Sequence, residues 1–185
     1  DLNSDPRMLH IELPAHNWDY CWSPDGSQIA FTSPGGTVDS LAGVWVFSID
    51  DSSLTHLFDR GRDVTWRYNN SELLFRVDNP PDNSPGIFKL RLPDRGGNEA
   101  EATLLIINGH KPECSPQNDF IAYSDNEIDG SLHIVNLDLQ ETYRSAAGAV
   151  HWNWAYNGSR LAFIINNYST GILSEVLWSV NITAP

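Results

Sequence analysis

The sequence predicts an all-β fold built from four copies of one antiparallel unit. A ten-residue pattern recurs four times, apolar residues stand at alternate positions after the turn in that pattern, and glycine and proline are scattered through 185 residues. Alternation is the period of a half-buried strand, and scattered Gly and Pro are typical of short strands joined by turns. With 41% hydrophobic residues the chain can bury a core, and its length fits one domain, 1–185.

The recurring pattern has a bulky or soft apolar first residue, Gly or Asn in fifth place and an aromatic in tenth. Its copies start at Trp22, Trp66, Cys114 and Trp154, and they read WSPDGSQIAF, WRYNNSELLF, CSPQNDFIAY and WAYNGSRLAF. Gly and Asn tolerate a positive φ, so their recurrence predicts a tight hairpin turn between two strands. The starts are separated by 44, 48 and 40 residues, and periods of this size indicate propellers or solenoids.

Each unit continues with two further strand-like segments, which makes four strands, the content of a propeller blade. These segments are GVWVFSID and LTHLFDRG, GIFKLRLP and ATLLIING, then SLHIVNLD and ETYRSAAG, while the fourth unit has only EVLWSVNI. We therefore expect a β-propeller with blades at about 18–60, 62–108, 110–148 and 150–182. The segment RMLHIELP at 7–14 either completes the last blade or ends a preceding blade of a longer parent chain.

The number of blades in the closed ring stays open at this stage. Exchange of the first strand closes a ring without exposed edges, but four blades make a small ring for this class. A longer parent, or a homodimer in which two chains build eight blades, remains an alternative. The chain has no starting Met and no basic-then-apolar leader, so it resembles a mature or excised segment.

Charge and hydropathy exclude several classes of partner. The chain carries 24 acidic against 11 basic residues, a net charge of −13, and the resulting field repels phosphate backbones and anionic lipids. Its longest apolar runs, such as 161–165, are far shorter than the roughly 20 residues of a membrane helix. We expect neither nucleic acid binding nor membrane insertion from this acidic protein, and we expect Cys21 and Cys114 to be free thiols rather than a disulfide.

The repeats resemble the TolB-type, WD-like propeller repeats of bacterial periplasmic proteins. Trp22, Ser23, Pro24, Asp25, Gly26, Ile29, Ala30 and Phe31 match that pattern in full. The copies from Cys114 and Trp154 match at most positions, whereas the second copy has Arg67, Tyr68 and Asn69 in place of Ser, Pro and Asp. The resemblance covers essentially the whole chain and implies a propeller in the periplasm or outside the cell. It implies little about function, because similar repeats serve Tol-system proteins, sensor modules and the propellers of prolyl oligopeptidase-type peptidases.

In a propeller, the first strand of each blade lines the central channel, and the loops between blades share one face with the loops between second and third strands. Function usually lies on that face. The candidate binding residues there are Trp18, Asp19, Arg62, Asp63, His110, Lys111, Glu113, His151, Trp152 and Tyr168. Three positions before the repeats stand Asp19, Asp63, Lys111 and His151, and one position before them stand Cys21, Thr65, Glu113 and Asn153.

These side chains are expected to converge on the channel. Asp19, Asp63 and Glu113 are weak candidates for a channel cation or for the amine of a ligand, because hard cations favour carboxylate oxygens. The favoured interpretation is that they are solvated or paired with Lys111 and Arg62, so no cofactor is expected. The run DNEIDG from Asp125 resembles the start of a calcium loop but lacks the closing Glu, and we expect a turn there.

The function predicted from these features is a non-catalytic module whose loop face binds a protein or peptide. The chain has neither the G-x-S-x-G elbow of α/β-hydrolases nor a His-Glu-x-x-His metal motif. The alternative is a propeller hydrolase, or the gating propeller of a larger peptidase. In that alternative the channel carboxylates and His151 bind a metal or substrate.

Overall fold

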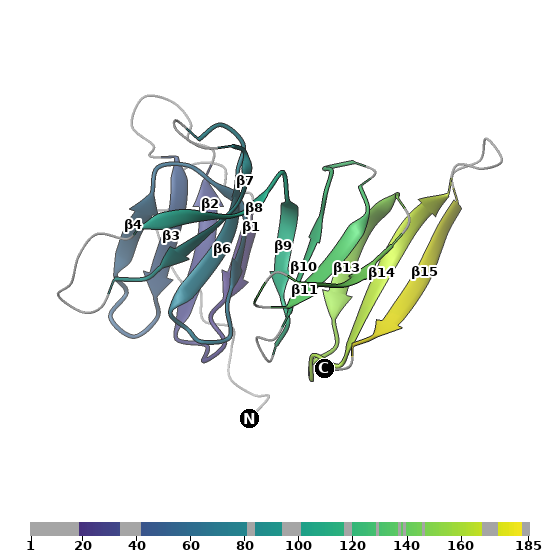
Figure 1. Cartoon of the computed structure of the whole chain (residues 1–185). Helices are drawn as coiled ribbons and strands as arrows, with labels where there is room; N and C mark the ends of the chain where they lie inside the picture. The colour runs from purple at the N-terminus through teal and green to yellow at the C-terminus, as the bar shows by residue number, and fades with distance from the viewer. Residues whose placement is uncertain are drawn as a thin grey trace.

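The computed structural model describes residues 19–33, 42–80, 84–93, 101–116, 120–128, 130–136, 138, 140–145, 147–167 and 174–182. The expected strand at 7–14 and the candidate residues Trp18 and Tyr168 lie outside these ranges. The described residues form four antiparallel sheets that follow one another in chain order, from the purple and blue sheet to the yellow-green sheet (Figure 1). The prediction of an all-β protein made of four repeated units is confirmed.

Within each sheet the strands are hydrogen-bonded in sequence order. The first sheet contains β1 (Asp19–Trp22), β2 (Gln28–Ser33), β3 (Gly43–Ser48) and β4 (Leu54–Phe58), and the second contains β5 (Arg62–Trp66), β6 (Glu72–Val77), β7 (Gly86–Arg91) and β8 (Ala102–Ile107). The third contains β9 (His110–Cys114), β10 (Phe120–Ser124), β11 (Leu132–Asn136) and β12 (Glu141–Arg144). The fourth contains β13 (Ala149–Trp154), β14 (Arg160–Asn167) and β15 (Ser174–Asn181).

The first three sheets pack in sequence order through their inner strands, and the fourth packs against the third through an apolar core. β1 contacts β5, and β5 contacts β9, as in successive propeller blades. The described part of the chain is an open row of sheets rather than a closed ring (Figure 1), so the prediction of propeller blades is confirmed but ring closure is not. Among the described residues no helix is long and apolar enough to cross a membrane.

The predicted hairpin turns join the first and second strands of the repeats. The turn residues Gly26, Asn70 and Gly158 all have positive φ, at 72°, 55° and 67°, while the equivalent Asn118 lies outside the described residues. The Gly26 amide donates to the Ser23 carbonyl at 2.9 Å, and the Gly158 amide donates to the Ala155 carbonyl at 2.8 Å. The repeated pattern therefore encodes a repeated turn geometry, because only a few residue types tolerate positive φ.

Each boundary between sheets has its own apolar core. Between the first and second sheets lie Ala30, Val44, Val46, Val64, Trp66, Leu73 and Phe75. Between the second and third lie Leu74, Ile87, Ile121 and Val135, and between the third and fourth lie Phe120, Ala122, Leu132, Ile134, Trp154, Leu161 and Phe163. Stability therefore depends on contacts between neighbouring repeats, since no single sheet buries both of its faces alone.

The two cysteines are free thiols, as the sequence analysis predicts. Cys21 packs against the apolar residues of the first boundary and Cys114 against those of the second. Burial raises the pKa of each thiol to about 12, so both remain protonated and unreactive near neutral pH.

Phe75 tests the contribution of these boundary cores. Its ring is fully buried and contacts the rings of Phe58 and Phe88 at 5.4 and 6.5 Å between centroids. We expect Phe75→Ala to lower the free energy of unfolding by about 3–5 kcal/mol, because it removes packing and leaves a cavity. Urea denaturation measures this change. The control Tyr156→Ala removes a ring that is 97% exposed, and it should change stability by less than about 0.5 kcal/mol. Equal effects of the two variants would contradict the assignment.

Candidate binding site on the inner strands

A hollow of about 540 Å³ lies among the inner strands of the four sheets. It is lined by three consecutive residues from each inner strand: 19–21 of β1, 63–65 of β5, 111–113 of β9 and 150–152 of β13. Six of the ten candidate residues therefore lie around one hollow, namely Asp19, Asp63, Lys111, Glu113, His151 and Trp152. Arg62 and His110 lie beside it, at the starts of β5 and β9.

The acids three positions before the repeats hold the next sheet in place. Asp19 Oδ2 accepts a hydrogen bond from the Asp63 amide at 2.9 Å and one from the Thr32 hydroxyl at 3.4 Å. The Asp63 carboxylate in turn accepts the amide of Lys111. Asp63 and Lys111 have positive φ values of 54° and 48° and lie where the pairing of their strands shifts register. Two carboxylates predicted to face a ligand thus bind backbone amides.

The residues one position before the repeats act in the same way. The amide of Trp66 donates to the Cys21 sulfur, and the amide of Trp154 donates to the Glu113 carboxylate. The Trp154 indole also donates to the Glu113 carbonyl at 3.2 Å. The first sheet therefore accepts amides of the following sheet through Asp19 and Cys21, the second through Asp63 and the third through Glu113, a role that the sequence analysis did not identify.

Burial perturbs the acids of the hollow. It raises the pKa of Glu113 to about 7, and the Trp154 amide opposes this shift. Burial also raises the pKa of Asp63, an effect that the positive charge of Arg62 opposes and the negative charge of Asp19 reinforces. Glu113 therefore changes its charge near neutral pH, which makes the charge of the hollow depend on pH.

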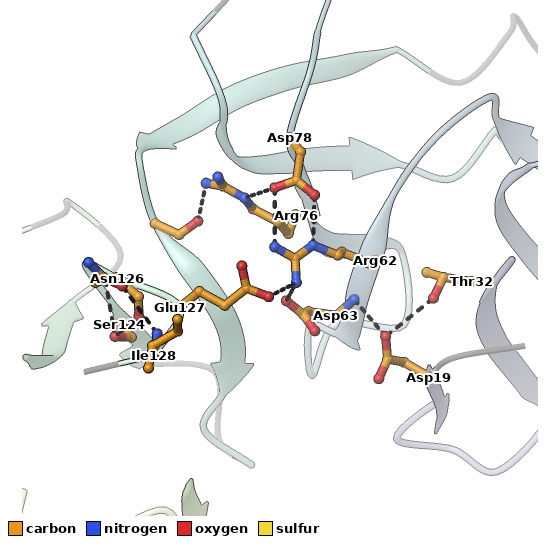
Figure 2. A network of polar contacts seen from close by, with 11 residues as sticks. Asp19, Thr32, Arg62, Asp63, Arg76, Asp78, Ser124, Asn126, Glu127 and Ile128 are labelled. Atoms are coloured by element: carbon orange, nitrogen blue, oxygen red, sulfur yellow. Dashed lines mark hydrogen bonds and ion pairs between the residues drawn. The ribbon is translucent and has the colours of Figure 1, made fainter. Parts of the chain in front are cut away.

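A network of ion pairs crosses from the second sheet to the third beside the hollow (Figure 2). Arg62 binds both oxygens of Asp78, at 2.8 and 3.2 Å, and binds Glu127 of the third sheet at 2.8 Å. Arg76 donates to Asp78 at 2.9 Å and to the Gly109 carbonyl at 2.7 Å. These guanidinium groups lower the pKa of Asp78, although burial opposes that shift. The loop residue Glu127, expected only to form part of a turn, joins two sheets.

His110 lies next to this network. Burial lowers its pKa, and the positive charges of Arg76 and Arg62 add to the shift. The described residues contain no group of three or more His, Cys, Asp or Glu side chains that could hold a metal ion. The channel cation therefore stays a prediction. The arrangement can instead offer a mixed surface of aromatic, basic and protonatable side chains, which suits a polar organic ligand.

Comparison with known proteins shows which solved structures have a similar fold. No family model matches the chain, and no curated protein does. Among solved structures, TolB from Acinetobacter baumannii superimposes with a TM-score of 0.69 and 11% identity, over 90% of this chain and 41% of TolB. Prolyl oligopeptidase B from Galerina marginata gives a TM-score of 0.65 at 13% identity, over 90% of this chain and 24% of the enzyme.

The β-propeller domain of the Trilobed protease from Pyrococcus furiosus is also similar, with a TM-score of 0.59 and 14% identity over 89% of this chain and 55% of that domain. The repeated sheets and these similar structures define the class of protein: the chain is a repeat protein made of propeller blades. More particularly, its fold is TolB-like, which confirms the resemblance of its repeats. The chain spans less than half of the length of the first TolB structure and about a quarter of prolyl oligopeptidase B.

Asp19 allows a test of the amide-binding role. Asp19→Asn keeps an oxygen that can accept the Asp63 amide, whereas Asp19→Ala removes it and leaves a partly buried amide without its acceptor. We expect the Ala variant to be less stable than the Asn variant by about 1–3 kcal/mol, as measured by urea denaturation. Equal stability of the two variants would show that the Asp63 amide does not depend on this acceptor.

The raised pKa of Glu113 predicts how the free energy of unfolding depends on pH. Its pKa is raised from 4.5 to about 7 by folding, so the folded state binds its proton more tightly than the unfolded state does. The contribution of Glu113 to stability is therefore fully present below pH 4.5 and is lost as pH rises to about 7. We expect Glu113→Gln to remove this loss, which amounts to as much as about 3 kcal/mol.

The measurement is urea denaturation of both proteins at pH 5 and pH 8. Relative to the wild type, the Gln variant should be more stable at pH 8 than at pH 5. Comparing the two proteins at each pH cancels the titration of Asp63 and His110, which both retain. If the two proteins lost stability equally between these pH values, Glu113 would not titrate as the structure indicates.

Proposed function

We propose that this chain is a binding module, in which the hollow among the inner strands and the adjoining loop face receive a segment of a protein or peptide. The single observation that supports this function is the hollow itself, to which all four sheets contribute. Its volume of about 540 Å³ lies within the range of about 300–1,000 Å³ typical of binding sites for organic ligands.

The lining chemistry suits a peptide. Trp152 offers an aromatic surface, Lys111 offers a cation, and Glu113 offers a carboxyl group that can exist in both protonation states near neutral pH. A peptide carries hydrogen-bond donors and acceptors along its backbone together with charged and apolar side chains, so it can satisfy all three. The net charge of −13 favours the approach of a basic segment over an acidic one.

We further propose that the module is not itself catalytic and needs no cofactor. The Asp19 and Asp63 carboxylates accept backbone amides, and Arg62 is bound to Asp78 and Glu127. Asp19, Asp63 and Arg62 are therefore poorly placed to exchange protons with a substrate, because chemistry would compete with their structural contacts. The resemblance of the repeats favours a periplasmic or extracellular site of action.

A second candidate is the gating propeller of a larger peptidase. The likeness to prolyl oligopeptidase B, with a TM-score of 0.65 over 90% of this chain, favours it. In that role the hollow would admit peptides to a hydrolase domain, so both candidates place a peptide in the same hollow. They differ in whether the bound peptide is released or passed to another domain.

Selection from a random peptide library on the immobilised chain tests the shared claim. Peptides enriched on the wild type should lose affinity by about tenfold or more on His151→Ala, because this exposed side chain lines the hollow without packing in the core. The control Tyr156→Ser alters an exposed ring that does not line the hollow and should leave affinity unchanged. Failure to enrich any peptide, or enriched peptides insensitive to His151→Ala, would overturn the proposed site.

A further inference from the structure

The repeats allow the two ends of the row of sheets to be compared with its interior, position by position. The first residue of the repeat packs against the preceding sheet: Trp66 is 5% exposed and Trp154 is 7% exposed. Trp22, which has no preceding sheet among the described residues, is 54% exposed, and its neighbour Tyr20 is 77% exposed. The first sheet therefore presents an aromatic surface of the kind that neighbouring repeats bury.

The ninth residue of the repeat shows the converse pattern. It packs against the following sheet, and Ala30, Leu74 and Ala122 are fully buried there. Ala162 of the fourth sheet occupies the same repeat position but is exposed. Ile164 and Leu177 lie beside it on the same face, since strand register pairs them with each other, and Leu177 is 73% exposed. The fourth sheet therefore presents the aliphatic surface that a following Trp covers elsewhere.

The hydrogen bonds at the two ends are complementary as well. At the first and third boundaries the amide of the first repeat residue donates to the side chain one position before the preceding repeat, from Trp66 to Cys21 and from Trp154 to Glu113. Asn153 is the equivalent acceptor in the fourth sheet, and its side chain is exposed.

The Trp22 amide is the equivalent donor in the first sheet. Trp22 pairs with Ile29 in the same register as Trp154 with Leu161, so its amide also points away from its own sheet. The donor at one end thus matches the acceptor at the other.

We propose that the fourth sheet of one chain packs against the first sheet of a second copy of this chain. Trp22 of the second copy would cover Ala162 and donate its amide to the Asn153 side chain, as Trp66 covers Ala30 and donates to Cys21 within one chain. The same contact made reciprocally relates two chains by two-fold symmetry and closes a ring of eight sheets. Eight blades lie within the usual size range of propellers. The inference does not depend on the identity of any ligand.

The solution mass and engineered cross-links test this interface together. We expect a dimer with twice the 20.7 kDa of one chain by light scattering. Trp22→Ser should weaken the dimer by about tenfold or more, because it deletes an aromatic anchor. Ala162→Lys places a charge on the opposing surface and should act similarly without altering the fold, since Ala162 is exposed. Tyr156→Ser, at an exposed ring outside both surfaces, is the matched control and should leave the mass unchanged.

Cross-linking distinguishes a second copy from closure of one chain on itself. Chains carrying Trp22→Cys, mixed with chains carrying Ala162→Cys under mild oxidation, should form a mixed disulfide-linked dimer. Mixing Trp22→Cys with Tyr156→Cys should not give that product. A monomer at every concentration at which the chain stays soluble would overturn the proposal. So would a chain with both Cys substitutions that cross-links only within itself, which would instead indicate a ring of four sheets.

Discussion

Amide groups along the inner edge of each sheet need hydrogen-bond acceptors, and the other features of the structure depend on how that need is met. The inner strand of a sheet has a partner on one side only, so its other edge carries backbone donors with no strand beside them. Leaving a buried donor unpaired costs about 1–3 kcal/mol. Here Asp19 and Cys21 of the first sheet, Asp63 of the second and Glu113 of the third each accept an amide of the sheet that follows. This arrangement fixes how successive sheets meet and therefore where the hollow forms.

The same requirement explains why the sequence predicted the location of the hollow better than the roles of its residues. The turns and strands follow from local chemistry, since Gly26, Asn70 and Gly158 need positive φ wherever the hairpin recurs. Residues at equal offsets from these turns must lie at equal places in the sheets, so the inner strands could be identified from spacing alone. The unpaired edge of an inner strand is a property of the assembled sheets, and no pattern within one repeat reveals which side chain satisfies it.

Contacts between sheets account for the other features that sequence could not predict. Asp63 and Lys111 adopt positive φ although neither is Gly or Asn, because the amide of each is turned toward an acceptor on the preceding sheet. The pairing of Arg62 with Glu127 joins residues 65 positions apart. The two acids that bind Arg62, Asp78 and Glu127, lie in loops of unequal length in two different repeats. Such pairs depend on the distance between loops in space, which the repeat pattern does not encode.

At the boundary between the third and fourth sheets one residue, Glu113, both lines the hollow and binds the next sheet. Three positions before the third repeat stands Lys111, which cannot accept an amide. Glu113 therefore accepts the amide of the next sheet at this boundary, and burial raises the pKa of the Glu113 carboxyl group to about 7. At the first boundary the equivalent role belongs to Cys21, whose thiol stays neutral with a pKa of about 12. Glu113 therefore both holds the next sheet and changes its charge near neutral pH. A ligand that enters the hollow beside Glu113 would therefore alter the group that joins the two sheets, and the packing of those sheets would in turn affect the affinity for the ligand.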